Sequence, residues 1–91
     1  MEKTLWYLLT GMRGGENRVR IIDSLTDTPK NANQLSEDLD LGYKTVRHHL
    51  SMLEDHDVVE TEGEGYGKMY FLTDRFMEHE KQFNKIRERM E

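Results

Sequence analysis

The sequence predicts an α+β fold that is mainly α-helical, with a three-helix core, a β-hairpin and a C-terminal helix. Apolar residues recur with helical spacing in two adjoining segments, 32–39 and 43–56, which meet at a short turn. Two β-prone runs, 58–62 and 68–72, flank a glycine-rich stretch that is typical of a hairpin. A further helical pattern over 16–25 completes the core.

Length and composition favour one small domain spanning residues 1–91. A chain of 91 residues with 35% hydrophobic content buries a core that is only marginally stabilising alone, so pairing with a second copy would help it. Since there is no cysteine, disulfides and thiolate metal sites are excluded. No apolar run approaches the roughly 20 residues that span a bilayer, and the N-terminus lacks a convincing signal-peptide core. We expect a cytoplasmic protein without membrane contact.

Residues 4–12 form the most apolar segment and contain the only tryptophan. The pattern does not distinguish a helical turn from a strand, and the segment could join the core or be exchanged with a partner. Because exposed aromatic patches usually mark contact surfaces, we expect residues 1–13 to share in a dimer interface. The residues predicted to take part are Leu5, Trp6 and Leu9.

A linker at 14–15 separates this segment from the first core helix, over 16–25. The core stripe of that helix consists of Val19, Ile22 and Leu25. Arg18 and Arg20 lie on the same helix and could reach phosphate, although solvated helix charges are the commoner outcome. The helix leads into an exit loop around the only proline, Pro29.

Residues 31–56 are predicted to form two helices around a tight turn. Asn31 and Gln34 have the spacing of a capping box at the start of the first helix. Gly42 allows the chain to turn without a side-chain penalty. The second helix has a core stripe of Val46, Leu50 and Leu53 and projects Lys44, Arg47, His48 and Ser51 on the opposite side. Periodicity alone is equally compatible with an ordinary helical hairpin whose polar face is solvated.

Leu35, the run from Leu41 to Leu53 and the pair Val58 and Val59 resemble the helix-turn-helix signature of the ArsR-type winged-helix transcription factors. The resemblance looks closest to archaeal members and spans residues 18–72. It implies a homodimer that binds DNA and regulates transcription. In a helix-turn-helix, the second helix lies in the major groove and the first braces it.

The hairpin over 58–72 is then the wing of a winged helix-turn-helix. In the family the wing tip often touches the minor groove or adjacent phosphates. Here three glutamates at positions 60, 62 and 64 outnumber Lys68, which departs from that pattern. Only Tyr66 and Lys68 are nominated as contacts at the tip.

Thr73 is a plausible N-cap for a last helix over 74–90. Five residues on this helix follow the spacing of a short coiled-coil seam: Phe76, His79, Phe83, Ile86 and Met90. We expect residues 73–91 to form a dimer contact through this stripe, the alternative being that it packs back on the core of its own chain.

The net charge of −5 opposes nucleic-acid binding unless the charge is segregated. Residues 43–53 contain a lysine, an arginine and two histidines but no acid. A second basic contribution is expected from Arg13, Arg18, Arg20 and Lys30. We therefore predict salt-sensitive binding of double-stranded DNA through a local basic patch.

Within this patch we expect Arg47 to read guanine and Lys44 to contact phosphate. The complete set of predicted DNA contacts is Tyr43, Lys44, Thr45, Arg47, His48, Ser51, Tyr66 and Lys68. The alternative function is a winged-helix protein-protein adaptor that does not touch DNA. We expect no enzyme, since no catalytic triad motif is present. We also expect no metal or other cofactor, because His79 has no second histidine at ligand spacing.

Overall fold

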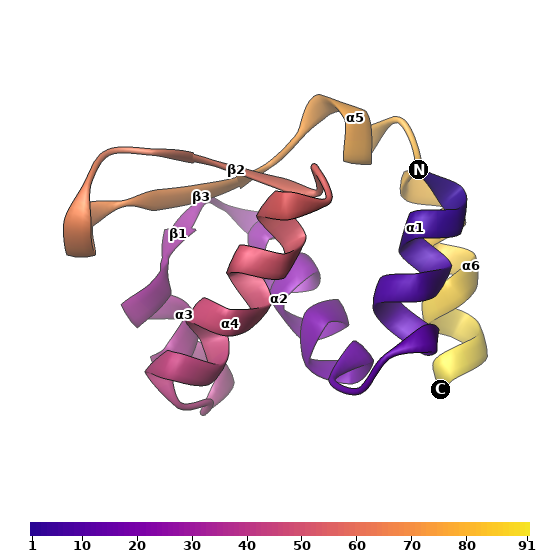
Figure 1. Ribbon diagram of the computed structural model, residues 1–91, viewed down its shortest axis with the longest axis horizontal. Helices are drawn as coiled ribbons and strands as arrows, with labels where there is room; N and C mark the ends of the chain where they lie inside the picture. Colours follow the sequence, from indigo (N-terminus) through magenta and orange to yellow (C-terminus); the bar gives the residue numbers. More distant parts are fainter.

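The elements follow one another in the predicted order, helices first and the hairpin before the C-terminal helices (Figure 1). The computed structural model describes all residues, 1–91. The helices are α1 (Glu2–Trp6), α2 (Gly15–Asp27), α3 (Ala32–Leu39), α4 (Tyr43–Asp55), α5 (Asp74–Met77) and α6 (Glu80–Met90), and the strands are β1 (Lys30–Asn31), β2 (Val59–Glu62) and β3 (Met69–Leu72). No helix combines the length and the apolar character that crossing a membrane requires.

The capping box at the start of α3 is formed as predicted. The Asn31 side chain accepts a hydrogen bond from the Gln34 backbone N–H at 2.8 Å, and the Gln34 side chain accepts one from the Asn31 N–H at 2.9 Å. Two donors that a helix start leaves without partners are thereby satisfied. This fixes where α3 begins and how it leads into α4.

The turn between α3 and α4 differs from the prediction in which residue makes it. Asp40, with φ of 54°, adopts the left-handed conformation, whereas Gly42 is extended with φ of −60° and ψ of 144°. Past Asp40, the Leu41 N–H reaches back to the Ser36 carbonyl at 3.1 Å and closes the end of α3. Aspartate tolerates this conformation better than most residues, so the turn does not need a glycine at position 40. Gly42 instead serves as the N-cap of α4.

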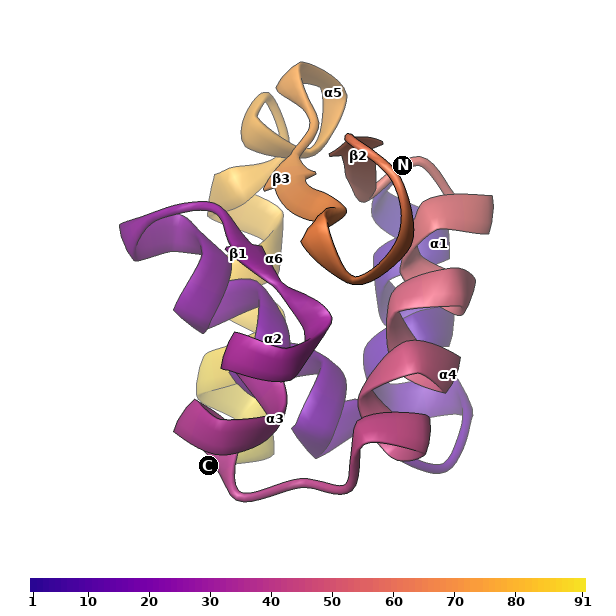
Figure 2. The ribbon, with the colours of Figure 1, turned by 90° about the vertical axis from the view of Figure 1, so that its left-hand side faces the viewer.

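The hairpin is confirmed, and it belongs to a three-stranded antiparallel sheet with the order β1-β3-β2. In β2 and β3, Val59 lies opposite Leu72 and Glu62 opposite Met69. The additional strand, β1, pairs Lys30 with Tyr70, and at two residues it is too short to produce an alternating pattern. The wing extends away from α1 and α6, and Figure 2 shows its tip between β1 on the left and α4 on the right.

The predicted single helix over 74–90 is in fact two helices, α5 and α6, joined at His79. His79 leaves helical geometry with φ of −111° and ψ of 20°, and its N–H closes α5 on the Phe76 carbonyl at 2.8 Å. In a straight helix, seven residues advance about 10.5 Å along the axis. The bend instead brings the rings of Phe76 and Phe83 to 5.4 Å, edge to face and both buried.

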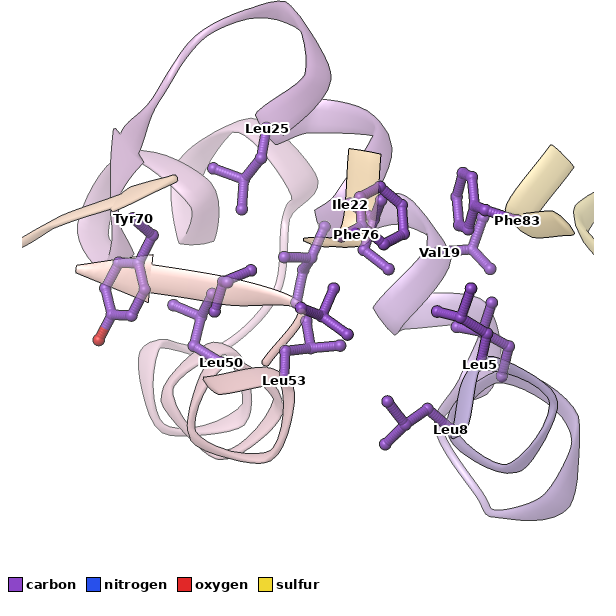
Figure 3. Packing of buried hydrophobic residues seen from close by; sticks show 14 of the residues in the cluster. Leu5, Leu8, Val19, Ile22, Leu25, Leu50, Leu53, Tyr70, Phe76 and Phe83 are labelled. Atoms are coloured by element: carbon purple, nitrogen blue, oxygen red, sulfur yellow. The ribbon is translucent and has the colours of Figure 1, made fainter. Parts of the chain in front are cut away.

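Residues 4–11 are helical, in α1 and in a π-helical turn over Tyr7–Gly11, whereas Met12 is extended. Helix α1 lies beside α6 (Figure 1). Much of the predicted dimer interface is covered by the chain itself: Leu5, Leu9, Phe76, Phe83 and Ile86 are buried in the core. Figure 3 shows Leu5, Phe76 and Phe83 within that cluster. The stripe on α6 thus packs on its own chain, the alternative stated for it, because α1 offers it an apolar partner. Trp6, His79 and Met90 remain partly exposed.

Candidate nucleic-acid interface

Helix α4 presents one face to the core and the other to solvent, as its periodicity predicts. Val46, Leu50 and Leu53 are completely buried against α2, α3 and the sheet. The opposite side carries exposed Lys44, Thr45, Arg47, His48 and Ser51. Burial of the apolar stripe therefore turns five of the eight predicted DNA-contacting side chains outward together.

The start of α4 is suited to an anion. No side chain caps it, since the N-cap is Gly42, whose carbonyl accepts the Val46 N–H at 3.0 Å. The N–H groups of the first turn and the positive end of the helix dipole therefore face outward next to Lys44 and Thr45. A phosphate group would find both hydrogen-bond donors and a lysine here.

A shallow pocket of about 230 Å³ lies between α4 and the wing. It is lined by Tyr43, Arg47, Gly65, Tyr66 and Lys68. Arg47 donates from Nη1 to the Tyr43 hydroxyl at 3.3 Å, and the rings of Tyr43 and Tyr66 are 6.1 Å apart. Tyr66 itself is 83% exposed. The fold thus brings the two nominated wing residues to the basic side of α4.

Tyr70 supports this pocket from the sheet. The Lys68 ammonium lies 5.9 Å from the centre of the Tyr70 ring. Burial raises the pKa of the Tyr70 phenol, so that the phenol stays neutral. An uncharged aromatic platform holds Lys68 without neutralising its charge.

The cations of this surface have no acidic partner in the chain. The three ion pairs are Lys30 with Asp38, Arg75 with Asp57, and Arg87 with Asp23. Lys44, Arg47 and Lys68 belong to none of them, although the glutamates of the wing are exposed nearby in sequence. Their charge is available to phosphate, which is the main source of affinity for DNA.

The second basic contribution expected from the N-terminal half is largely absent. Arg18 is completely buried, which contradicts the expectation that it could reach phosphate. The Arg20 guanidinium donates to the Leu39 carbonyl at 2.7 Å, and Lys30 donates to the Ser24 hydroxyl at 2.7 Å. Only Arg13 keeps an exposed side chain without a bonding partner.

Behind α4 lies a buried polar cluster that the sequence prediction missed. Arg18 donates from Nε to the Leu8 carbonyl at 2.6 Å and from Nη2 to the Arg13 carbonyl at 2.7 Å, and its Nη1 lies 3.1 Å from Nδ1 of His49. Burial, then the positive charges of Arg18 and His48, lower the pKa of His49. The sequence feature that could have revealed the burial of Arg18 and His49 is their position on the apolar side of their helices. Arg18, for example, lies four residues before Ile22.

The structure offers no ready metal site. No three His, Asp or Glu side chains lie close enough together to hold a metal ion. His48 and His49 are near neighbours, with ring centres 5.5 Å apart, but Nδ1 of His49 already faces Arg18.

A helix-turn-helix with an outward basic face on its second helix, followed by a hairpin, defines a winged-helix DNA-binding protein. Residues 15–61, more than half of the chain, match the family described as "Bacterial regulatory protein, arsR family". The chain belongs to this ArsR family of DNA-binding transcriptional regulators, as its sequence signature predicted. Members of the family are transcription factors and not enzymes, which agrees with the expected absence of an active site.

Solved structures with the same fold come from several organisms. A transcriptional regulator homologue from Pyrococcus horikoshii OT3 is similar with a TM-score of 0.73 and 22% identity, over 99% of this chain and 94% of that one. HlyU from Vibrio cholerae N16961 is similar with a TM-score of 0.69 and 24% identity, over 92% of this chain and 91% of that one. The transcriptional repressor BigR from Xylella fastidiosa is similar with a TM-score of 0.68 and 19% identity, over 93% of this chain and 74% of that one. At these identities the likeness establishes the fold, and no curated protein matches the sequence.

Proposed function

We propose that this regulator acts as a homodimer and inserts α4 into the major groove of double-stranded DNA. The observation that carries the proposal is the outward face of α4, where Lys44 and Arg47 are exposed and unpaired. Residues 43–53 contain no acid, so DNA phosphates meet no repulsion along the first three turns. This places positive charge where a recognition helix enters a groove, even though the whole chain is acidic.

Within that complex, Arg47 is our candidate for reading guanine and Lys44 for contacting phosphate. The hydrogen bond from Arg47 to Tyr43 is long, at 3.3 Å, and exposed, so exchanging it for two bonds to a base costs little. Thr45, His48 and Ser51 line the same face and complete the proposed base and phosphate contacts. Tyr66 and Lys68 extend the surface onto the wing.

We further propose that residues 1–13 and 73–91 provide the dimer contact from their outer side. Their buried residues hold α1 against α6, while Trp6, His79 and Met90 remain partly exposed. Tyr7, beside them in sequence, is 52% exposed. A second copy bound here would present two recognition helices, as needed to read half-sites one helical turn apart.

The proposal is tested by measuring binding to genomic DNA fragments over a salt series, with fluorescence anisotropy as the readout. Replacing both cations, Lys44→Ala with Arg47→Ala, should lower affinity by roughly 10- to 100-fold or more, since a guanine contact alone contributes about 1–3 kcal/mol. The matched control, Arg20→Ala with Lys30→Ala, removes the same charge from two side chains that lie outside both proposed surfaces and are bonded to Leu39, Ser24 and Asp38. It should bind like the wild type.

The acidic balance of the chain favours the alternative function, a protein-protein adaptor. If the wild type binds no DNA even at low salt, this alternative replaces the proposal. Equal losses for the two double variants would mean that only net charge matters and would reject α4 as the recognition helix.

A further inference from the structure

Arg18 is a buried cation without a counter-ion. Its side chain is 0% exposed, and no carboxylate pairs with it. Its three hydrogen bonds go to the Leu8 carbonyl, the Arg13 carbonyl and His49. One side chain on α2 thus ties the N-terminal segment to α4. Because a buried charge is costly unless its donors are satisfied, the position of each of these partners is constrained.

The chemistry of the guanidinium fixes the protonation state of His49. Arginine has only donors, so Nδ1 of His49 must accept, and the ring must be neutral with its proton on Nε2. A proton added at Nδ1 would remove this hydrogen bond and set two cations about 3 Å apart.

No neighbouring group compensates such a proton. The charged or titratable groups that act on His49 are Arg18 from α2 and His48 from α4 itself, and both disfavour it. From the loop before α2, Gly14 closes over the pair. A Cβ at Gly14 would lie 2.6 Å from Cε1 of His49 and 3.1 Å from Nη1 of Arg18, so the ring cannot turn away freely on that side.

We propose that Arg18 is a positioning residue for the recognition helix, acting through His49, and that protonation of His49 releases α4 and weakens DNA binding in acid. The inference rests on the proposed insertion of α4 into DNA. His49 lies on α4 one residue from His48 and two from Arg47, so any shift that relieves the charge repulsion moves the DNA-contacting face. Through Arg18, the position of α4 therefore depends on whether the His49 ring is protonated.

His48 must be separated in the test, because it is a second histidine on α4. It is exposed on the proposed DNA-contacting side, so a charge on its ring would act on phosphate directly and not through Arg18. The variant His48→Asn removes this contribution. The variant His49→Asn keeps an acceptor near the position of Nδ1, because the asparagine Oδ1 occupies that place, but it does not titrate.

The experiment measures affinity from pH 8 to pH 5 at constant ionic strength, for a duplex that the wild type selects from a random pool at pH 7.5. Where binding requires loss of one proton, affinity falls by up to about tenfold per pH unit. We expect His48→Asn to lose affinity several-fold between pH 7.5 and pH 5, and by at most about thirtyfold because the pKa of His49 lies below the ordinary value near 6.5. The double variant His48→Asn, His49→Asn should change by less than about threefold. Equal losses in the two proteins would overturn the inference.

A second measurement tests the same inference without the His49→Asn variant, in case that variant does not fold. NMR titration of His48→Asn follows the His49 ring and the backbone amides of α4 together. We expect one transition, below the ordinary histidine range near pH 6.5, in which both move. A ring that titrates without any shift in α4 would overturn the inference. If the wild type selects no duplex, the proposed function fails, and this titration still decides whether Arg18 positions α4.

Discussion

Two arginines on amphipathic helices have different surroundings and hence different roles. Arg47 is exposed, has no acidic partner, and donates one long hydrogen bond to Tyr43. Arg18 is completely buried and hydrogen-bonds to two carbonyls and a histidine ring. An unneutralised exposed arginine can bind phosphate or a base edge, whereas a buried one can only organise the chain around it.

The buried pair makes folding itself sensitive to acid. His49 has a lowered pKa in the folded chain, because it is buried and close to Arg18 and His48. The unfolded chain, in which the histidine titrates near pH 6.5, then binds more protons, so stability falls as the pH drops below that value. In urea unfolding, the wild type should lose more stability than His49→Asn between pH 7.5 and pH 5. Once the pH lies below the pKa of the folded state, the difference amounts to about 1.4 kcal/mol for each unit by which folding lowers the pKa.

The comparison with His49→Asn isolates this histidine from the carboxylates, which are the same in both proteins. A wild type and a His49→Asn variant with parallel pH profiles would show that His49 ionises equally in the folded and unfolded chains.

At the scale of elements, Thr73 joins the wing to the C-terminal helices. Its hydroxyl accepts the Phe76 N–H at 3.0 Å and donates to the Asp57 carbonyl at 2.7 Å, and the residue is buried. We expect Thr73→Ala to lower the free energy of unfolding by about 1–2 kcal/mol, because a helix cap and a buried carbonyl both lose their partner. Thr73→Ser keeps the hydroxyl and should lose clearly less. Urea unfolding of the two variants measures the difference, and equal losses would assign the effect to the missing methyl group.

Periodicity predicted the elements that depend on one stripe or one cap. The orientation of α4 followed from Val46, Leu50 and Leu53, and the start of α5 followed from Thr73. The break at His79 was missed because no glycine or proline marks it. At this break the rings of Phe76 and Phe83 meet edge to face, which is a contact made by tertiary packing. A local pattern cannot report such a contact.

The candidate site was predicted to a similar extent and for the same reason. The exposed face of α4 depends only on helical projection, which the sequence contains. The pocket between α4 and the wing depends on how Tyr43 meets Tyr66 across 23 positions of the chain, and the cluster behind α4 depends on Arg18 meeting His49. Both pairings are set by tertiary packing, which helical projection alone does not report.

For the molecule as a whole, segregation of charge matters more than its sum. The chain carries a net charge of −5, yet the cations of α4 and Lys68 are unpaired on one side. Exposed acids on the wing and on α6 cover other parts of the surface. In the proposed complex, this asymmetry would orient the protein toward DNA through α4 and oppose binding through its remaining faces.

The proposed dimer can be tested by substitutions that leave the hydrophobic core of the protein intact. Truncation after Leu72 would delete buried Phe76, Phe83 and Ile86, so loss of a dimer would only report unfolding. His79→Glu with Met90→Glu instead places like charges on partly exposed positions of the proposed interface. Light scattering should show that the dimeric mass falls to that of a monomer, while circular dichroism keeps the helical content.

Binding follows from assembly, because a monomer engages only one half-site and loses the gain from simultaneous contact. The charge-reversed protein should therefore bind the selected duplex far more weakly than the wild type does. The variant with Lys44→Ala and Arg47→Ala should remain dimeric while losing DNA, so the two defects separate assembly from recognition. A charge-reversed protein that keeps its dimeric mass would place the contact between copies elsewhere on the surface.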